Sequence, residues 1–243
     1  MTEEGKVVSM KEFICVLKQT NKVTKYNFWY LMIYLLAGVV FGVMFTWLPY
    51  FSTGVLISME GIIALGFVAG NMCMCWFLFF PADYMQALAM GKTRKYLFGA
   101  HYLLWFRNAL ICMLGILGFC LLKNHVYAHL ADGLVVWGDE WSVLSNPLVF
   151  VTIVLCVPAV ILFFGGMRLF FGVKLLWGIP GLTVLGMGLA KLEDMCPNFV
   201  IFKWFGVSGG EPNTVAICLL SLISGAIMLG LAWLALRKQR VIG

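Results

Sequence analysis

The chain has 243 residues, of which 62% are hydrophobic and 12% are charged, and its formal net charge is +6. Soluble globular domains carry about 25% charged residues, so this composition excludes an ordinary soluble protein. Apolar residues gather in long runs, and the chain lacks the basic, aromatic-interleaved face that binds nucleic acid, so the sequence predicts a membrane protein with no nucleic-acid partner.

The first segment predicts an amphipathic helix over residues 9–25. Met10, Phe13, Ile14 and Leu17 recur at helical spacing, and charged residues occupy much of the opposite face. We expect such a helix to lie in the membrane interface on the cytoplasmic side, in contact with the lipid bilayer. The alternative is a solvated N-terminal arm.

Six apolar runs then predict six transmembrane helices in a single all-α membrane domain over residues 1–243. Five of the runs reach the roughly 20 residues that a helix needs to cross the hydrocarbon core. The fifth run along the chain is shorter, and we expect it to tilt or to thin the bilayer locally. The runs are continuous, without alternation, so spans made of strands are not expected. The predicted spans cover residues 26–48, 55–80, 97–122, 147–167, 172–190 and 215–236.

Basic residues between the spans predict the orientation. Of the 17 Lys and Arg residues, 13 fall on one side of the predicted membrane, three fall on the other, and Arg107 lies within the third span. Cytoplasmic segments carry the excess of Lys and Arg in membrane proteins. We therefore expect a multi-pass protein of the cell membrane with both termini in the cytoplasm.

Between the second and third spans, the sequence predicts a short cytoplasmic helix over residues 82–91. Pro81 suits a helix start, Gly91 suits the position just past a helix end, and Thr93 can cap the next helix. A short helix that ends in a basic turn can dock a cytoplasmic partner. Alternatively, the basic residues only set the topology and meet anionic lipid.

The letters Gly-Lys-Thr at residues 91–93 match the end of a phosphate-binding loop. That loop requires a second glycine five residues earlier, where this chain has Gln86, and it must follow a buried strand. Both requirements fail, so we expect this chain to bind no ATP.

Polar residues within the predicted spans are candidates for a transport pathway, because such groups are costly in a membrane and often functional. They are Glu60, Asn71, Arg107 and Asn108. From their depths along the helices, we expect Arg107 to meet Asn71 and not Glu60. The alternative is that Arg107 and Glu60 extend to opposite interfaces without lining a pathway.

Glycines four residues apart predict close helix contacts in the first span, at Gly38 and Gly42, and in the second, at Gly66 and Gly70. Between spans five and six, a segment rich in aromatic residues and interrupted by Pro and Gly predicts a re-entrant or interfacial element on the outer side. It is too interrupted to form a further span.

Catalytic and metal-binding patterns are missing from the sequence. It has no H-E-x-x-H and no G-x-S-x-G motif. Cys73 and Cys75 lie two apart on one helix, where they face away from each other and cannot share a metal. We therefore expect a chain that is not an enzyme and holds no metal or cofactor of its own.

The order of these elements resembles the membrane-spanning subunits of small, six-helix bacterial ATP-binding-cassette exporters. The resemblance covers nearly the whole chain, and its most specific part is LAMGKTRKYLF at residues 88–98. This stretch is similar to the family's cytoplasmic small-x-G-x-[ST]-R-[KR] segment at Gly91, Thr93, Arg94 and Lys95. In the family, that segment follows the coupling helix that docks on the ATPase subunit.

The resemblance implies that a separate cytoplasmic ATPase binds ATP and Mg²⁺, and that a second membrane subunit, identical or related, completes the pathway. It implies docking through Tyr84, Met85, Leu88 and Arg94, and an amphipathic substrate, a bacteriocin-like peptide before a drug or lipid. The main alternative is a stand-alone membrane immunity or scaffold protein that needs no ATPase. A channel or proton-coupled transporter is a third.

Overall fold

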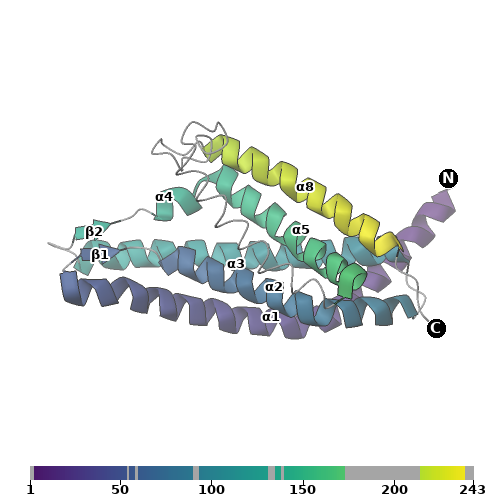
Figure 1. Cartoon of the computed structure of the whole chain (residues 1–243), viewed down its shortest axis with the longest axis horizontal. Coiled ribbons are helices and arrows are strands. Elements are labelled where there is room, and N and C mark those ends of the chain that lie inside the picture. Colours follow the sequence, from purple (N-terminus) through teal and green to yellow (C-terminus); the bar gives the residue numbers. More distant parts are fainter. Residues whose placement is uncertain are drawn as a thin grey trace.

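A computed structural model describes residues 3–53, 55–57, 60–89, 93–130, 135–137, 140–172 and 214–238. These residues form a bundle of long helices with one small two-stranded sheet (Figure 1). The all-α class is therefore confirmed for the described residues, apart from that sheet. The predicted fifth span, beyond Gly172, and the predicted outer element lie outside the described residues.

The first two helices are longer than the sequence predicted. Helix α1 (Glu3–Thr53) contains the predicted interface helix and the first span as one continuous helix of 51 residues. Helix α2 (Glu60–Ala89) likewise runs on through Pro81 and includes most of the predicted helix 82–91. Proline usually kinks or ends a helix, but neighbouring helices in a membrane bundle can satisfy the backbone groups that it frees. The prediction of separate short helices was therefore wrong.

The chain continues through α3 (Arg94–Leu130), the short α4 (Glu140–Leu144), α5 (Pro147–Phe171) and α8 (Thr214–Lys238). Thr93 directly precedes α3, and its carbonyl accepts the first hydrogen bond of that helix from the Leu97 amide at 3.0 Å. This is the position of a helix N-cap, as predicted. At the start of α5, the Asn146 side chain accepts a hydrogen bond from the Leu148 amide.

Two strands connect the ends of the long helices. Strand β1 (Val55–Ile57) pairs in parallel with β2 (Val135–Trp137), with Val55 opposite Val135. The predicted second span began at Val55, which was wrong, because α2 begins only at Glu60. Apolar and β-branched residues of this kind suit a strand as well as a helix, so the sequence pattern did not distinguish the two.

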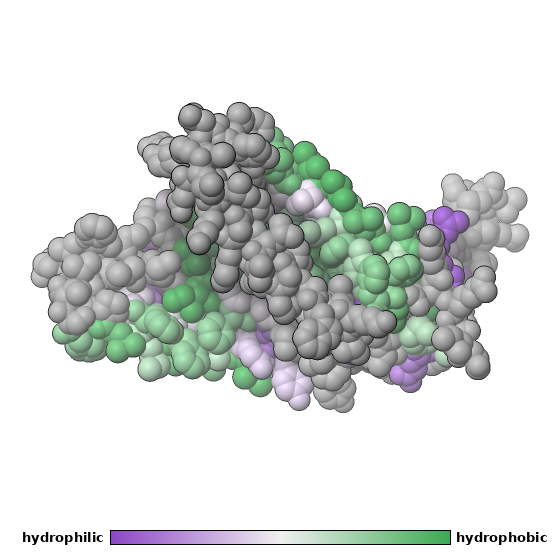
Figure 2. All heavy atoms as spheres, viewed as in Figure 1, coloured by the Kyte–Doolittle hydropathy of each residue, from purple (hydrophilic) through white to green (hydrophobic). Residues whose placement is uncertain are grey.

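Four described helices are long and apolar enough to cross a membrane, which supports a membrane protein. Their apolar stretches correspond to the first, third, fourth and sixth predicted spans. In helix α2, the described side chains of Glu60–Met72 form a further apolar stretch. Figure 2 shows apolar residues over much of the described surface, with strongly hydrophilic residues toward one end. The four stretches are Phe28–Leu48, Arg94–Val126, Pro147–Phe171 and Thr214–Arg237.

The described N- and C-terminal parts lie at the same end of the bundle, called here the terminal end (Figure 1). Helices α5 and α8 run parallel and pack closely. Gly225 of α8 lies against Cys156 of α5, and further along both helices Gly166 of α5 lies against Ala232 of α8. The Cys156 thiol also donates to the Ser221 carbonyl at 3.3 Å. Glycine thus lets two helices approach that are far apart in sequence.

The two predicted glycine pairs differ in their surroundings. A Cβ atom at Gly42 would lie 2.8 Å from the Glu60 backbone, and one at Gly38 would lie 2.9 Å from the Ala64 Cα atom. The predicted close contact is therefore confirmed for α1, which crosses α2 at these glycines. At Gly66 and Gly70 on α2, a Cβ atom would meet no atom of the described residues within 4 Å, so the structure shows no close contact there.

Candidate functional site

The end of α2 and the start of α3, together called here the α2–α3 turn, lie at the terminal end (Figure 1), and two side chains of the predicted docking set pack into the bundle there. Tyr84 and Leu88 of α2 are buried and belong to one apolar cluster with Val16 of α1 and Leu97 of α3. Their spacing of four residues places them on the same face of α2. That face therefore packs onto the bundle, and these two side chains do not point outward.

Tyr84 acts as a packing residue. Its ring lies 6.5 Å from the His101 ring of α3. Burial raises the pKa of Tyr84 to about 12, although the positive charge of Arg94 acts in the opposite direction. The phenol therefore stays neutral near pH 7, as a side chain inside an apolar cluster must.

Contacts across the start of α3 connect the turn to both terminal segments. The Arg94 guanidinium donates from Nη1 to the Arg237 carbonyl, near the end of α8, at 2.9 Å. The Phe13 and Tyr96 rings contact each other at 6.1 Å between α1 and α3. A cation at a helix C-terminus also interacts favourably with the helix dipole. The turn is thus fixed to α1 and α8.

The exposed surface of this turn differs from the predicted docking set. Gln86, Ala89, Thr93 and Lys95 are exposed, whereas Met85 and Arg94 are half-buried. Tyr84 and Leu88 were predicted to contact the ATPase, but they are buried, so a surface partner cannot reach them without opening the apolar cluster. Gly91, also predicted to take part, lies outside the described residues.

A second candidate site, at the opposite end of the bundle, is an ion pair that the sequence did not predict. Glu60, at the start of α2, accepts a hydrogen bond from the Lys123 ammonium of α3 at 3.0 Å. The two side chains are 0% and 4% exposed. Glu60 was predicted to line a pathway or to extend outward, and Lys123 is one of the three basic residues that were predicted to fall on the outer side. Instead, each neutralises the other's charge inside the bundle.

The hairpin geometry explains this pairing. Glu60 lies 29 residues before Ala89, at the end of α2, and Lys123 lies 29 residues after Arg94, at the start of α3. Two antiparallel helices that leave one turn bring residues at equal distances from it to the same height. Counting outward from the turn would have identified the partner, had α3 been expected to extend beyond residue 122.

Arg107 is the third candidate site. Its Nε and Nη2 atoms donate to the Asn108 side-chain oxygen at 3.3 and 3.1 Å, and Nη1 donates to the Asn21 side-chain oxygen at 2.9 Å. Arg107 is half-buried, Asn108 is fully buried and Asn21 is exposed. The predicted contact with Asn71 is thus replaced by contacts with Asn21 and Asn108. Asn71 itself is buried on α2.

The predicted pathway residues do not gather at one place. Arg107 and Lys123 are 16 residues apart on α3, which is about 24 Å along a helix. The acid and the arginine therefore lie at different levels of the bundle, as their depths predicted. Among the residues that the structure describes, no three His, Cys, Asp or Glu side chains come together as metal ligands.

Comparisons with known proteins add no relationship. No family model, curated protein or solved structure matches this chain.

Proposed function

We propose that this chain is the membrane subunit of an ATP-driven ATP-binding-cassette exporter, and that a separate ATPase docks on its α2–α3 turn. The proposal extends to six spans with both termini in the cytoplasm of a multi-pass cell-membrane protein. The observation that carries it is the attachment of this turn to α1 through Phe13 and Tyr96, and to α8 through Arg94. A force applied at the turn reaches three membrane helices at once.

The docking surface in this proposal consists of the exposed Gln86, Ala89, Thr93 and Lys95, with Met85 and Arg94 at its edge. Tyr84 and Leu88 transmit the movement inward, because they connect the surface to the apolar cluster. The two states of the ATPase then bias two arrangements of the bundle. The ATPase supplies ATP and Mg²⁺, and this chain binds neither.

The substrate in this proposal is amphipathic, with a bacteriocin-like peptide as the first candidate. A second membrane subunit, identical or related, completes the pathway. Exposed apolar residues on α1, α3 and α8 leave surface for lipid and for such a subunit. A stand-alone immunity or scaffold protein requires no attachment between a cytoplasmic turn and the terminal segments.

Co-purification with the ATPases encoded beside this chain tests the proposal. We would compare the wild type with a double variant, Ala89→Glu and Lys95→Glu, which changes only exposed side chains. We expect the ATPase to purify with the wild type and to be reduced at least tenfold with the variant, because like charges and a lost cation weaken an interface.

Asn124→Glu provides the matched control, since Asn124 is exposed near the opposite end of α3. We expect this control to retain the ATPase at the wild-type level. If no ATPase binds the wild type, the exporter proposal fails and the stand-alone protein replaces it. Equal binding by the double variant would instead show that the ATPase docks elsewhere on the chain.

A further inference from the structure

Arg107 carries a positive charge that no acid neutralises among the residues that the structure describes. Its three hydrogen bonds all end on neutral amides, those of Asn21 and Asn108. An arginine side chain keeps its charge and has five N–H donors, so two donors remain, one on each terminal nitrogen. The amides thus fix the orientation of the guanidinium without cancelling its charge.

The position of this group corresponds to the headgroup layer of a bilayer. Asn21 is exposed and lies seven residues before Phe28, where the apolar stretch of α1 begins, which is about 10 Å along a helix. Arg107 lies within the apolar stretch of α3, and its side chain reaches Asn21 at this level. Long basic side chains extend toward the interface in this way.

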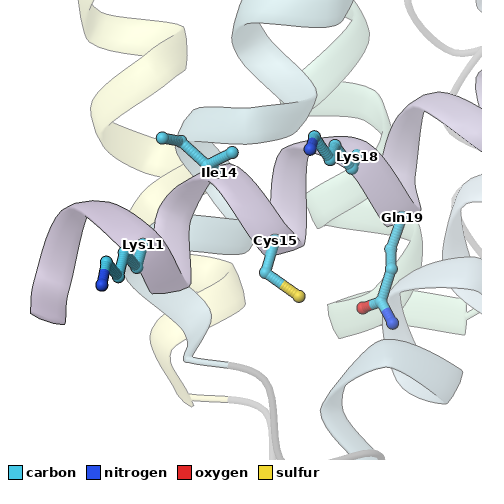
Figure 3. Close-up of a pocket in the computed structure, with 5 residues that line it drawn as sticks. All are labelled: Lys11, Ile14, Cys15, Lys18 and Gln19. Atoms are coloured by element: carbon cyan, nitrogen blue, oxygen red, sulfur yellow. The ribbon is translucent and has the colours of Figure 1, made fainter.

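Lys18 adds a second cation on the same surface. It is exposed and lies three residues before Asn21, about one helical turn away. Beside it is a hollow of about 390 Å³, lined by consecutive turns of α1 (Figure 3). The lining residues are Lys11, Ile14, Cys15, Lys18 and Gln19. Glu12, the acid of this segment whose side chain is described, shares a face with Gln19 and lies roughly 120° around the helix from Lys18.

An exposed apolar stripe lies further along α1, on the same face as Lys18. Trp29 and Leu36 follow Lys18 by 11 and 18 residues, which are close to whole numbers of helical turns, so all three share one face. Their exposed fractions are 62% and 66%. Along this face, the order of residues matches the parts of a phospholipid. The cation at Lys18 lies at the level of the headgroup, Trp29 at the interface, and Leu36 along the acyl chain.

We propose that Arg107, Lys18 and Asn21 form a binding site for the headgroup of an anionic phospholipid, whose acyl chain lies along Trp29 and Leu36. The remaining guanidinium donors and the lysine bind the phosphate, and the additional negative charge distinguishes anionic from zwitterionic lipids. This site does not depend on the proposed ATPase, because its residues lie outside the docking surface on the α2–α3 turn.

Native mass spectrometry of the full chain in mild detergent tests the site. We would titrate phosphatidylglycerol or phosphatidylcholine into the wild type and the variants Arg107→Gln, Arg107→Lys and Lys18→Gln. The wild type should prefer phosphatidylglycerol, and Arg107→Gln should weaken that binding about tenfold, since hydrogen bonds to charged groups contribute that much. The affinity of Arg107→Lys for phosphatidylglycerol should lie between those of the wild type and Arg107→Gln, because lysine keeps the charge and loses the planar guanidinium.

Arg237→Gln is the matched control, because it removes the same charge from an exposed position of α8. Equal weakening by Arg237→Gln and Arg107→Gln would overturn the site in favour of general charge attraction. Displacement of the lipid by inorganic phosphate at equal concentration would show a free-anion site instead. A shift from dimer to monomer in the Arg107 variants, without bound lipid in the wild type, would assign the surface to a second copy. Should Arg107→Gln unfold, the exposed Lys18→Gln decides, and unchanged lipid binding there refutes the site.

Discussion

The bundle accommodates charged side chains in different ways at its two charged sites. At the opposite end from the termini, Glu60 and Lys123 are buried and neutralise each other, and α1 approaches Glu60 closely at Gly42. Nearer the terminal end, Arg107 is half-buried and donates hydrogen bonds only to neutral amides. The difference indicates that the first site is structural, because its charges are already paired. The second retains charge and donors for a ligand.

The largest effect on stability is expected at Lys123. Lys123→Met should destabilise the protein by about 3–5 kcal/mol, because it leaves the Glu60 carboxylate buried without its cation. The double variant Glu60→Leu with Lys123→Met should recover most of that loss, since an apolar pair of similar volume replaces the ion pair. Thermal unfolding in detergent measures both. A double variant as unstable as the single one would show that the charge pair is not the stabilising feature.

A second, intermediate effect is expected at the helix crossing beside the pair. Gly42→Ala should cost about 1–3 kcal/mol, because the new Cβ atom would meet the Glu60 backbone at 2.8 Å and one helix must move. Gly66→Ala is the matched control on α2, where no atom of the described residues lies within 4 Å of the new Cβ atom. There we expect unchanged or slightly higher stability, as alanine favours helix over glycine. The same unfolding measurement compares them, and equal losses would contradict the close crossing.

The smallest effect should come from the charge that remains available. Arg107→Met should cost about 1 kcal/mol, because it leaves the buried Asn108 oxygen without its donor but removes a half-exposed charge that has no ionic partner. Its unfolding temperature should therefore lie well above that of Lys123→Met. If Arg107→Met proved as destabilising as Lys123→Met, Arg107 would be a structural residue like Lys123, and the contrast between the two sites would disappear.

Residue patterns predicted much of the local structure because those features depend on neighbours in sequence. Thr93 precedes α3 as a cap, and α5 begins at Pro147, because capping residues and proline act within one helical turn. Apolar runs identified four helices of spanning length. The same local signals failed at Pro81, through which α2 continues.

The candidate sites were predicted less well, because each depends on residues far apart in the chain. Tyr84 and Leu88 were predicted to face a cytoplasmic partner, and the contacts with α1 and α3 show that they are buried. Asn21 lies 86 residues from its partner Arg107, within a segment that alone suggests an interfacial helix. No spacing rule connects such positions, since the contact depends on how two helices align.

The sequence by itself indicated a membrane protein through its long apolar runs, four of which correspond to helices of spanning length, and it showed that residues 86–93 lack the complete G-x-x-x-x-G-K-[ST] pattern. These properties follow from composition and from interactions within a few turns of one helix. The tertiary structure alone decided which charges are neutralised. It placed Lys123 beside Glu60 and left Arg107 with two amides, because helix packing determines which distant side chains share one level of the bundle.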